Sequence, residues 1–508
     1  MGFRDGNRKL VRLRSNTPFR GVGMKIRRLW LSIVFCVLSA LSNSTHAGEA
    51  TAQHLLDSIQ EVSGVQGLSA AVLEDGDIIW TGQSGFSDAA RLAPVTEETQ
   101  FRIASVSKLF AAAIALKLTE SEVLDIDENI RAYVPDWPAD KAEQITLRHL
   151  AAHTSGIEHY TADDRYDPDK EYSSLNDSLS IYAHKPLLFQ PGDDYNYSSY
   201  GYALMGAAIE NATGRSFEEN FRKQIANPLS LTHTDIELID QLPADASHLF
   251  VQYGGEIPRN NQHHVVGATG ILSTAADLVR FADAYMRGEI VSPKLRDFSL
   301  SLAMLNNGKP VATERFAIGF GWRIGANWEG DPVVHHAGVT PGARSILTYN
   351  RARNIAAALL SNAAWTSRIE TTGELLVTAA AEKIDPETCP TGDWRYDGVF
   401  ASNPDARPQN DNARGAIHIA LERGVCMAAF TPEGELASWL ADFPGSSQPI
   451  EMKATLVAER KGGLIFAAAI PWGAFPLTWT HGETPTLSGD FANRSVNFRL
   501  YPIDTALP

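Results

Sequence analysis

Hydrophobic and polar positions follow two alternating patterns from about residue 50 to 385. QHLLDSIQEV has apolar residues at the three- and four-residue spacing of an amphipathic helix. LSAAVLEDGDIIWTGQSGFSD follows, and its two strand-like runs are joined by Asp75-Gly76, a pair typical of hairpin turns. Helical patterns then dominate from Ser105 to about residue 285.

Strand-like runs return near the end of this region, in FAIGFGWRIG, VVHHAG, SILTYN and NIAAALLSN. RIETTGELLVTAAAEKI closes the region as a helix. Strands at both ends of the region, with helices between them, predict one antiparallel sheet. The two ends of the region would contribute its strands, and the helices would cover it. The expected fold class is α/β in the mixed, α+β sense, over residues 50–385.

The stretch DPETCPTGDWRYDG reads as a domain boundary. Short strands follow it in AIHIALERGVCMAAF, ATLVAERKGGLIFAAAIP and SVNFRLYPI. Arg423-Gly424 and Lys461-Gly462-Gly463 are typical of the hairpin turns between such strands. We therefore predict a small all-β domain over residues 390–508.

The N-terminus has the layout of a secretory signal peptide. The segment from Met24 begins with basic residues, continues with an apolar run from Leu29 to Leu41, and reaches small residues ending at Ala47. The apolar run is short for a membrane span, although an uncleaved anchor is the alternative. Residues 1–23 do not fit a signal, so we place the start at Met24. We expect residues 1–47 to be removed, leaving a periplasmic or secreted protein with no integral membrane span.

Charge and cysteine content narrow the possible partners. Lys and Arg number 44 against 60 Asp and Glu, and the net charge of −16 argues against nucleic acid. Cys36 lies in the signal, while Cys389 and Cys426 remain and are favoured to form a disulfide in an exported protein. Neither has a nearby Cys or His at metal-ligand spacing, so we predict no metal and no other cofactor.

The first candidate for chemistry is Ser105 with Lys108, in FRIASVSKLF. Residues three apart lie on one helix face, and this pair opens an apolar helix in which a lysine is otherwise hard to explain. A desolvated lysine has a depressed pKa and can accept a serine proton. A lysine that reaches the surface through its aliphatic stem is the alternative.

Two further stretches add candidates. In YNYSSYGYALMG, Tyr197 held near a lysine ammonium can ionise more easily and act as a base, although packing is the simpler interpretation. In VVHHAGVTPGARS, His336 can donate a hydrogen bond to a substrate, while His335 faces the other way by strand alternation. For either histidine taken alone, a structural role with its hydrogen bonds satisfied is the simpler interpretation. A strand glycine such as Gly338 often marks close backbone approach. The polar and aromatic stretch at residues 157–195 is either a binding wall or a solvated insertion.

Taken together in this order, the three motifs resemble those of the serine β-lactamase and penicillin-binding-protein superfamily, over about residues 52–383. SVSK matches its Ser-x-x-Lys, YSS its Tyr-x-Asn in class C, and HAG its Lys/His-x-Gly. The likeness is greatest to class C β-lactamases and their esterase and peptidase relatives. HTSGIEHY and YSSYGY are also similar to the mitochondrial β-lactamase-like serine protease and its bacterial relatives.

The resemblance implies a sheet covered by helices, an all-helical subdomain and an acyl-enzyme mechanism. Ser105 would attack a carbonyl, Lys108 and Tyr197 would shuttle its proton in an order that stays open, and water would release the product. The backbone N–H groups of Ser105 and Val339 would form the oxyanion hole. The C-terminal domain resembles the small barrel-like appendages of some members.

Two departures from the family pattern bear on the substrate. Ser199 replaces the usual Asn, so one amide that contacts substrate is missing. His336 replaces a Lys, which weakens the positive charge that would hold a substrate carboxylate, and Arg344 is the candidate to compensate. The sequence therefore predicts a hydrolase of a small-molecule or peptide substrate: a peptide, a peptidoglycan stem, an ester or a β-lactam.

Two other classes compete with this interpretation. A Ser-His-Asp hydrolase lacks support because the chain has no G-x-S-x-G elbow. A catalytically inactive penicillin-binding-like module with a binding or regulatory role in the cell envelope is the second alternative. Retention of Ser105, Lys108 and Tyr197 together argues against it, since an inactive site has no need of all three.

Overall fold

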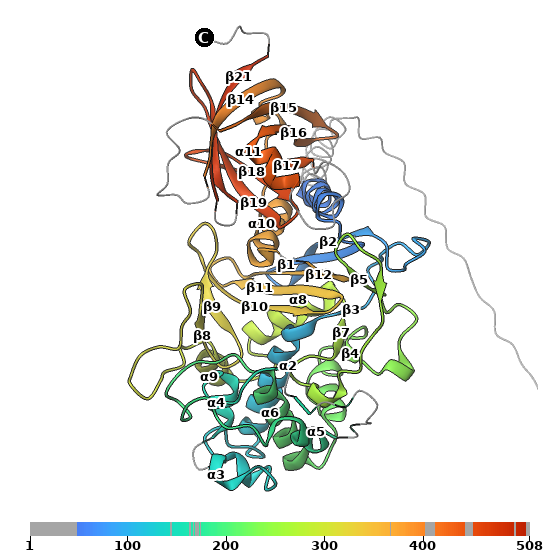
Figure 1. Cartoon of the computed structure of the whole chain (residues 1–508), viewed down its shortest axis with the longest axis vertical. Coiled ribbons are helices and arrows are strands. Elements are labelled where there is room, and N and C mark those ends of the chain that lie inside the picture. The colour runs from blue at the N-terminus through green and yellow to red at the C-terminus, as the bar shows by residue number, and fades with distance from the viewer. Residues whose placement is uncertain are drawn as a thin grey trace, which may run out of the picture. The chain divides into compact units, whose positions relative to one another are not determined.

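The computed structural model describes most of the chain, in ten segments (Figure 1). These are residues 48–142, 145–161, 164–165, 167, 172, 174–365, 367–401, 412–441, 451–491 and 494–503. The predicted signal segment, residues 1–47, lies outside the described residues. Within the described part of the chain, no helix combines the length and apolar character needed to cross a membrane.

A seven-stranded antiparallel sheet forms the centre of the first part. Its order is β2-β1-β12-β11-β10-β9-β8, so strands from the two ends of the region pair side by side, as predicted. The predicted hairpin turn is present, since Asp75 and Gly76 both have positive φ, at 49° and 98°. The strands are β1 (Gly67–Glu74), β2 (Asp77–Gly85), β8 (Ala317–Ile318), β9 (Arg323–Ala326), β10 (Pro332–Thr340), β11 (Ala343–Asn350) and β12 (Ile355–Ser361).

Helices cover both faces of this sheet because successive strand residues point to opposite sides. In β1, Val72 packs in a core with residues 48–63, which are helical, and with α10 (Ile369–Ala381). Its neighbour Ala71 packs in the other core, with α2 (Ser107–Glu120) and α8 (Ala275–Met286). Both faces are therefore buried, which explains the continuous apolar run of the strand.

The segment between the two groups of strands is mainly helical, as predicted, but carries short strands that the sequence did not reveal. Elements of two or three residues leave no alternating pattern to detect. The helices are α3 (Ala139–Ala142), α4 (Leu147–Ala151), α5 (Leu175–Tyr182), α6 (Ser199–Thr213), α7 (Phe217–Phe221) and α9 (Pro293–Ser299). The short strands are β3 (Phe101–Arg102), β4 (Asp235–Ile236), β5 (Leu249–Val251), β6 (Glu256–Ile257) and β7 (Ile271–Ser273), and a further one, β13 (Ala363–Ala364), follows β12.

The C-terminal part is all-β, and its eight strands close into a barrel, drawn in orange and red in Figure 1. The predicted turn at Arg423-Gly424 is present, with φ of 52° and 84°. The strands are β14 (Gly392–Ala401), β15 (Ala413–Glu422), β16 (Val425–Gly434), β17 (Met452–Arg460), β18 (Gly463–Ile470), β19 (Gly473–Thr480), β20 (Thr486–Phe491) and β21 (Arg494–Pro502), with α11 (Glu435–Ala441) after β16. The predicted fold class, a helix-covered antiparallel sheet followed by a small all-β domain, is confirmed.

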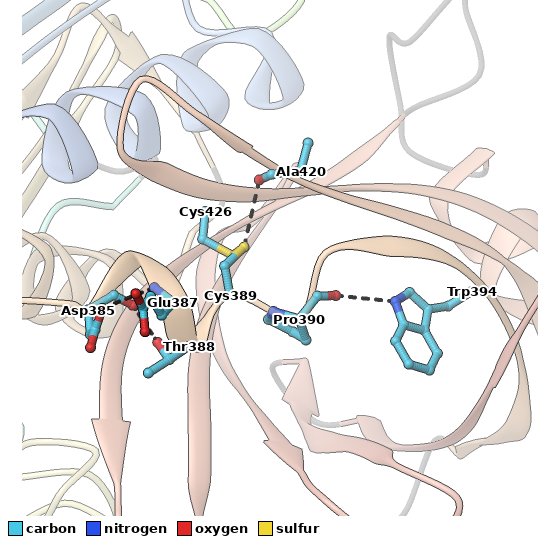
Figure 2. The surroundings of a disulfide bond; sticks show 8 residues. All are labelled: Asp385, Glu387, Thr388, Cys389, Pro390, Trp394, Ala420 and Cys426. Carbon is cyan, nitrogen blue, oxygen red and sulfur yellow. Dashed lines mark hydrogen bonds between the residues drawn. A yellow bond between two sulfur atoms is a disulfide. The ribbon is translucent and has the colours of Figure 1, made fainter.

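A disulfide joins Cys389, just before β14, to Cys426 in β16 (Figure 2). Their Cα atoms are 5.7 Å apart, within the range that a disulfide needs. The bridge ties the segment that enters the barrel to a strand of the barrel wall. Beside it, the Trp394 indole donates a hydrogen bond to the carbonyl of Pro390 at 3.3 Å.

The barrel packs on α10 and on the helical residues 48–63. Val457 and Ile465 of the barrel belong to the same apolar core as α10, and the Ala474 N–H donates to Thr372 Oγ1 at 3.0 Å. The described residues between 48 and 503 belong to one compact unit. The domain boundaries that we drew near residues 385 and 390 therefore stay a prediction.

Candidate active site

Ser105 lies in a tight turn between a strand and the buried helix α2. Strand β3 ends at Arg102, the 3-10 turn Ala104–Val106 follows, and α2 begins at Ser107. Ala104 has a φ of 47°, which is unusual for a residue with a side chain and is typical of functional turns. The Ser105 side chain is partly exposed and lines a cavity.

Lys108 is completely buried behind this serine. Its Nζ is 3.1 Å from Ser105 Oγ, as the three-residue spacing predicted, and it also donates to Ser199 Oγ at 3.0 Å and to the Ala268 carbonyl at 2.9 Å. Burial lowers the pKa of Lys108, and the nearby Tyr197 opposes this only in part. The lysine can therefore lose its proton more easily than a surface lysine and act as a base.

Tyr197 approaches Ser105 from the other side. Its Oη is 2.8 Å from Ser105 Oγ, and its ring centroid is 5.0 Å from Lys108 Nζ. Burial acts to raise the pKa of Tyr197, but the charges of Lys108 and Arg323 and two hydrogen bonds outweigh it, so the pKa is lowered. Ser105 Oγ thus accepts hydrogen bonds from two groups with lowered pKa values, and either group can take up the serine proton once it has lost its own.

Ser199 is tied to the site by two hydrogen bonds. Its Oγ accepts from Lys108, and its backbone N–H donates to His159 Nδ1 at 3.2 Å. It also lines the cavity. Ser199 therefore helps to orient Lys108. It also lies at the position where a substrate contact was predicted.

Strand β10 brings its backbone against the turn that carries Ser105, at Gly338. A Cβ at position 338 would lie 2.4 Å from the Ile103 carbonyl oxygen and 2.9 Å from the Ser105 nitrogen, so only glycine fits. Strand β9 pairs with β10 only from Pro332 to His335, so the later part of β10 is not covered on that edge. Val339, at 54% exposure, lines the cavity in this later part.

His336 occupies a different position from the one expected. It is 1% exposed, and it is not among the residues that line the cavity. Its Nδ1 is 2.8 Å from the Ala337 carbonyl, which can only accept, so this nitrogen carries the hydrogen. Burial and the charges of Arg323 and Lys108 lower the pKa of His336 well below its usual value. The imidazole is neutral, and its Nδ1–H is not available to a substrate.

Two arginines supply positive charge on the cavity wall instead. Arg344, which the sequence suggested, donates to the Ser367 carbonyl at 3.2 Å. Arg323, which it did not, has its guanidinium carbon 5.8 Å from the Tyr197 ring centroid and 4.5 Å from that of Phe316. Among the described residues, neither arginine forms an ion pair. Arg323 directly follows the GFGW stretch and pairs with His335 of β10. Its position on the cavity wall depends on this pairing of β9 with β10, which the sequence does not show.

The cavity in front of Ser105 has a volume of about 770 Å³. The segment after residue 157 contributes His159, Tyr160 and Asp164 to its lining, so the described part of that segment forms a wall of the cavity. No group of three His, Cys, Asp or Glu side chains that could hold a metal occurs within the described ranges. The remaining lining residues include Thr161, Tyr200, Asn260, Gln262, His264, Val265, Thr269, Arg315, Ala337, Thr340, Pro341 and Glu370.

Ser105 in the turn before α2, the buried Lys108 in α2 and Tyr197 in the loop before α6 meet around one hydroxyl beside an antiparallel sheet. This arrangement is typical of serine hydrolases. The profile of the Beta-lactamase family matches residues 52–381. The chain therefore belongs to the Beta-lactamase family of serine hydrolases, and the predicted family and enzyme class are confirmed.

Curated relatives agree with this assignment. The chain is 26% identical over 313 residues to penicillin-binding protein 4* of Bacillus subtilis (strain 168), covering 58% of this chain and 67% of that protein. It is 25% identical over 309 residues to the human mitochondrial serine beta-lactamase-like protein LACTB, covering 47% of this chain and 56% of that protein. The matches thus span between about half and two thirds of these relatives.

A solved structure resembles nearly the whole chain. The octameric penicillin-binding protein homologue from Pyrococcus abyssi aligns with a TM-score of 0.55 at 19% identity, covering 89% of this chain and 99% of that one. This coverage is more than residues 52–381 alone can supply, so the likeness in fold extends beyond the family match. At this identity the likeness shows the fold alone.

Proposed function

We propose that the protein hydrolyses an amide or ester through an acyl-enzyme on Ser105. The observation that carries the proposal is that Ser105 Oγ lies within hydrogen-bond distance of both Lys108 Nζ and Tyr197 Oη. The hydroxyl attacks the substrate carbonyl as its proton passes to this pair, and the same groups return a proton to the leaving group. Water then attacks the ester on Ser105 and releases the acid.

The tetrahedral intermediate requires donors for its oxyanion, and the backbone N–H groups of Ser105 and Val339 are our candidates. The close approach of β10 to the nucleophile turn at Gly338 supports this choice. Donors of this kind are worth about 3 to 4 kcal/mol each in the transition state.

The substrate class that we propose is a small molecule or peptide that carries a carboxylate near the scissile bond. Support comes from Arg323 and Arg344, which line the cavity and form no ion pair with a described carboxylate. Arg344 is nevertheless close enough to Glu370 on the same wall for that carboxylate to act on its pKa. Peptides, peptidoglycan stems, esters and β-lactams remain within this class. We do not expect nucleic acid as a substrate or partner, because the net charge of the chain is −16.

We also propose that the protein is exported and works in the periplasm or outside the cell. The signal-like layout of residues 24–47 and the Cys389–Cys426 disulfide support this, because disulfides persist in oxidising compartments.

The proposed reaction is tested with an activated ester and a penicillin, on the wild type and on Ser105→Ala. We expect the wild type to hydrolyse the ester with a burst, and Ser105→Ala to lose about three orders of magnitude in kcat/KM. Intact mass after incubation with penicillin should show an adduct in the wild type only, and the rate at which it decays separates a β-lactamase from a penicillin-binding peptidase. If neither probe reacts in a Ser105-dependent way, the protein is the catalytically inactive binding module instead.

The role of Arg323 gives a second test of this site. Arg323→Gln should raise KM about tenfold for a substrate with a free carboxylate, since a charge-assisted hydrogen bond is worth about 1.5 to 3 kcal/mol. The same substrate with its carboxylate amidated should show little change in KM. Arg315→Gln is the matched control, because Arg315 also lines the cavity but is paired with Glu370 at 3.3 Å. Equal losses for the free and amidated substrates would contradict the assignment.

A further inference from the structure

His153 occupies a backbone position that usually belongs to glycine. Helix α4 ends just before it, and the Thr154 N–H closes the helix on the His149 carbonyl at 2.9 Å. His153 has a φ of 60°, in the left-handed region that disfavours residues with a Cβ. A histidine at such a position suggests that its side chain is needed there.

The chain on both sides of Tyr197 is bonded to this histidine. The Asn196 N–H donates to the His153 carbonyl at 2.9 Å, and the Ser198 N–H donates to His153 Nδ1 at 3.1 Å. The imidazole also packs on Tyr197, with ring centroids 4.4 Å apart and an interplanar angle of 38°. His153 therefore contacts residues 196, 197 and 198 with its backbone, its ring face and its ring nitrogen.

The bond from Ser198 fixes the state of the imidazole. A backbone N–H can only donate, so Nδ1 must carry a lone pair. Burial lowers the pKa of His153 well below its usual value, and the charges of Lys108 and Arg323 lower it further. The ring is therefore neutral, with its acceptor held toward Ser198.

We propose that His153 is a positioning residue that holds Tyr197 Oη against Ser105 Oγ. His153 is 4% exposed and is not among the residues that line the cavity, so it acts through Tyr197 and not on the substrate. The inference rests on the proposed function, in which Tyr197 shares the proton of Ser105 over their 2.8 Å contact. A loosened Tyr197 would slow the proton transfer while leaving the cavity wall in place.

Two substitutions separate the contacts of His153. His153→Phe keeps a flat ring but removes the acceptor for Ser198, and we expect kcat to fall about 10- to 100-fold with KM within about twofold. His153→Asn places an amide oxygen close to the position of Nδ1 and tolerates left-handed backbone, so it should recover most of the lost kcat. Should the Phe variant not fold, His153→Gly removes the side chain contacts without backbone strain, and the same loss is expected.

The measurement is steady-state hydrolysis of an activated ester by the full chain, with kcat normalised to the burst so that unfolded protein is not counted. Tyr197→Phe provides the decisive background: the cost of His153→Phe should largely vanish there, because the group that it positions is gone. His149→Phe is the matched control, since His149 lies on α4 and caps that helix through Thr146. It should lower the melting temperature without changing kcat per burst.

Two outcomes would overturn the inference: an unchanged kcat per burst in the folded variant, or a loss of the same size in the Tyr197→Phe background. A wild type that shows no Ser105-dependent burst would instead overturn the proposed function, and the role of His153 with it. The two failures are therefore distinguished before any His153 variant is compared.

Discussion

Lys108→Met is expected to lower kcat/KM by about three orders of magnitude while the protein stays folded. The lysine is the buried group that contacts Ser105 Oγ, Ser199 Oγ and the Ala268 carbonyl together, so its loss removes both a proton acceptor and the group that orients the serine. Methionine has similar volume and fills the space without a charge. The change is measured with an activated ester, and acylation of Ser105 is followed by intact mass.

The same variant should reveal the state of the lysine through stability. Because burial lowers the folded-state pKa of Lys108 below its ordinary 10.5, the unfolded chain binds this proton more readily than the folded chain. The free energy of unfolding of the wild type therefore rises with pH toward 10.5, by a contribution that Lys108→Met lacks. The stability of the variant relative to the wild type should thus fall as pH rises.

The control for the activity measurement is Lys117→Met, on the same helix. Lys117 donates to the Gln224 carbonyl at 3.0 Å and lies away from Ser105, so activity should be retained. Activity in Lys108→Met within about tenfold of the wild type would show that this lysine is not the essential base. A pH-independent stability difference would show that its pKa is not lowered in the folded state.

The parts of the site that could be predicted from the sequence are those whose residues lie close together along the chain. Ser105 and Lys108 are three residues apart at a helix start, so the helical repeat alone brings them together. The hairpin at Asp75-Gly76 and the glycine at position 338 were likewise predictable, because each answers to backbone conformation or close approach nearby. The family resemblance then joined these local signals to Tyr197, which lies 92 residues from Ser105.

Residues that act through tertiary contacts were not predictable in this way. Arg323 acquires its place on the cavity wall from the order of strands β9 and β10, and nothing in its neighbours along the chain marks it. His153 begins the stretch HTSGIEHY, whose family likeness assigns no role to any single residue. The role that we propose for it depends on three contacts with residues 196–198. His336 was predicted to contact the substrate. Strand alternation shows on which side of the sheet a side chain lies, but it does not show how deeply that side chain is buried, and His336 is 1% exposed.

The cavity wall at Asn260 is held by a buried arginine, Arg102, whose contribution to stability can be measured. Arg102, just before the nucleophile turn, donates through Nε to Glu237 at 2.6 Å, and both side chains are 1% exposed. Its Nη1 and Nη2 donate to the side chain and the carbonyl of Asn260, at 2.8 and 2.7 Å, and Asn260 lines the cavity. One arginine therefore ties the strand that leads to Ser105 to the cavity wall.

Arg102→Met should lower the free energy of unfolding by about 3 kcal/mol, the low end of the range for breaking a buried ion pair, because Glu237 loses one of its two arginine partners and keeps only Arg259. The matched control is Arg148→Met, which breaks an exposed pair with Asp127 that has the same 2.6 Å distance, and about 1 kcal/mol or less is expected there. Denaturant unfolding measures both. Equal losses for the two variants would mean that burial does not set the worth of the Arg102 pair. A large loss for Arg102→Met alone, with ester hydrolysis reduced in the fraction that stays folded, would show that this arginine both stabilises the fold and holds the turn at Ser105 against the cavity wall.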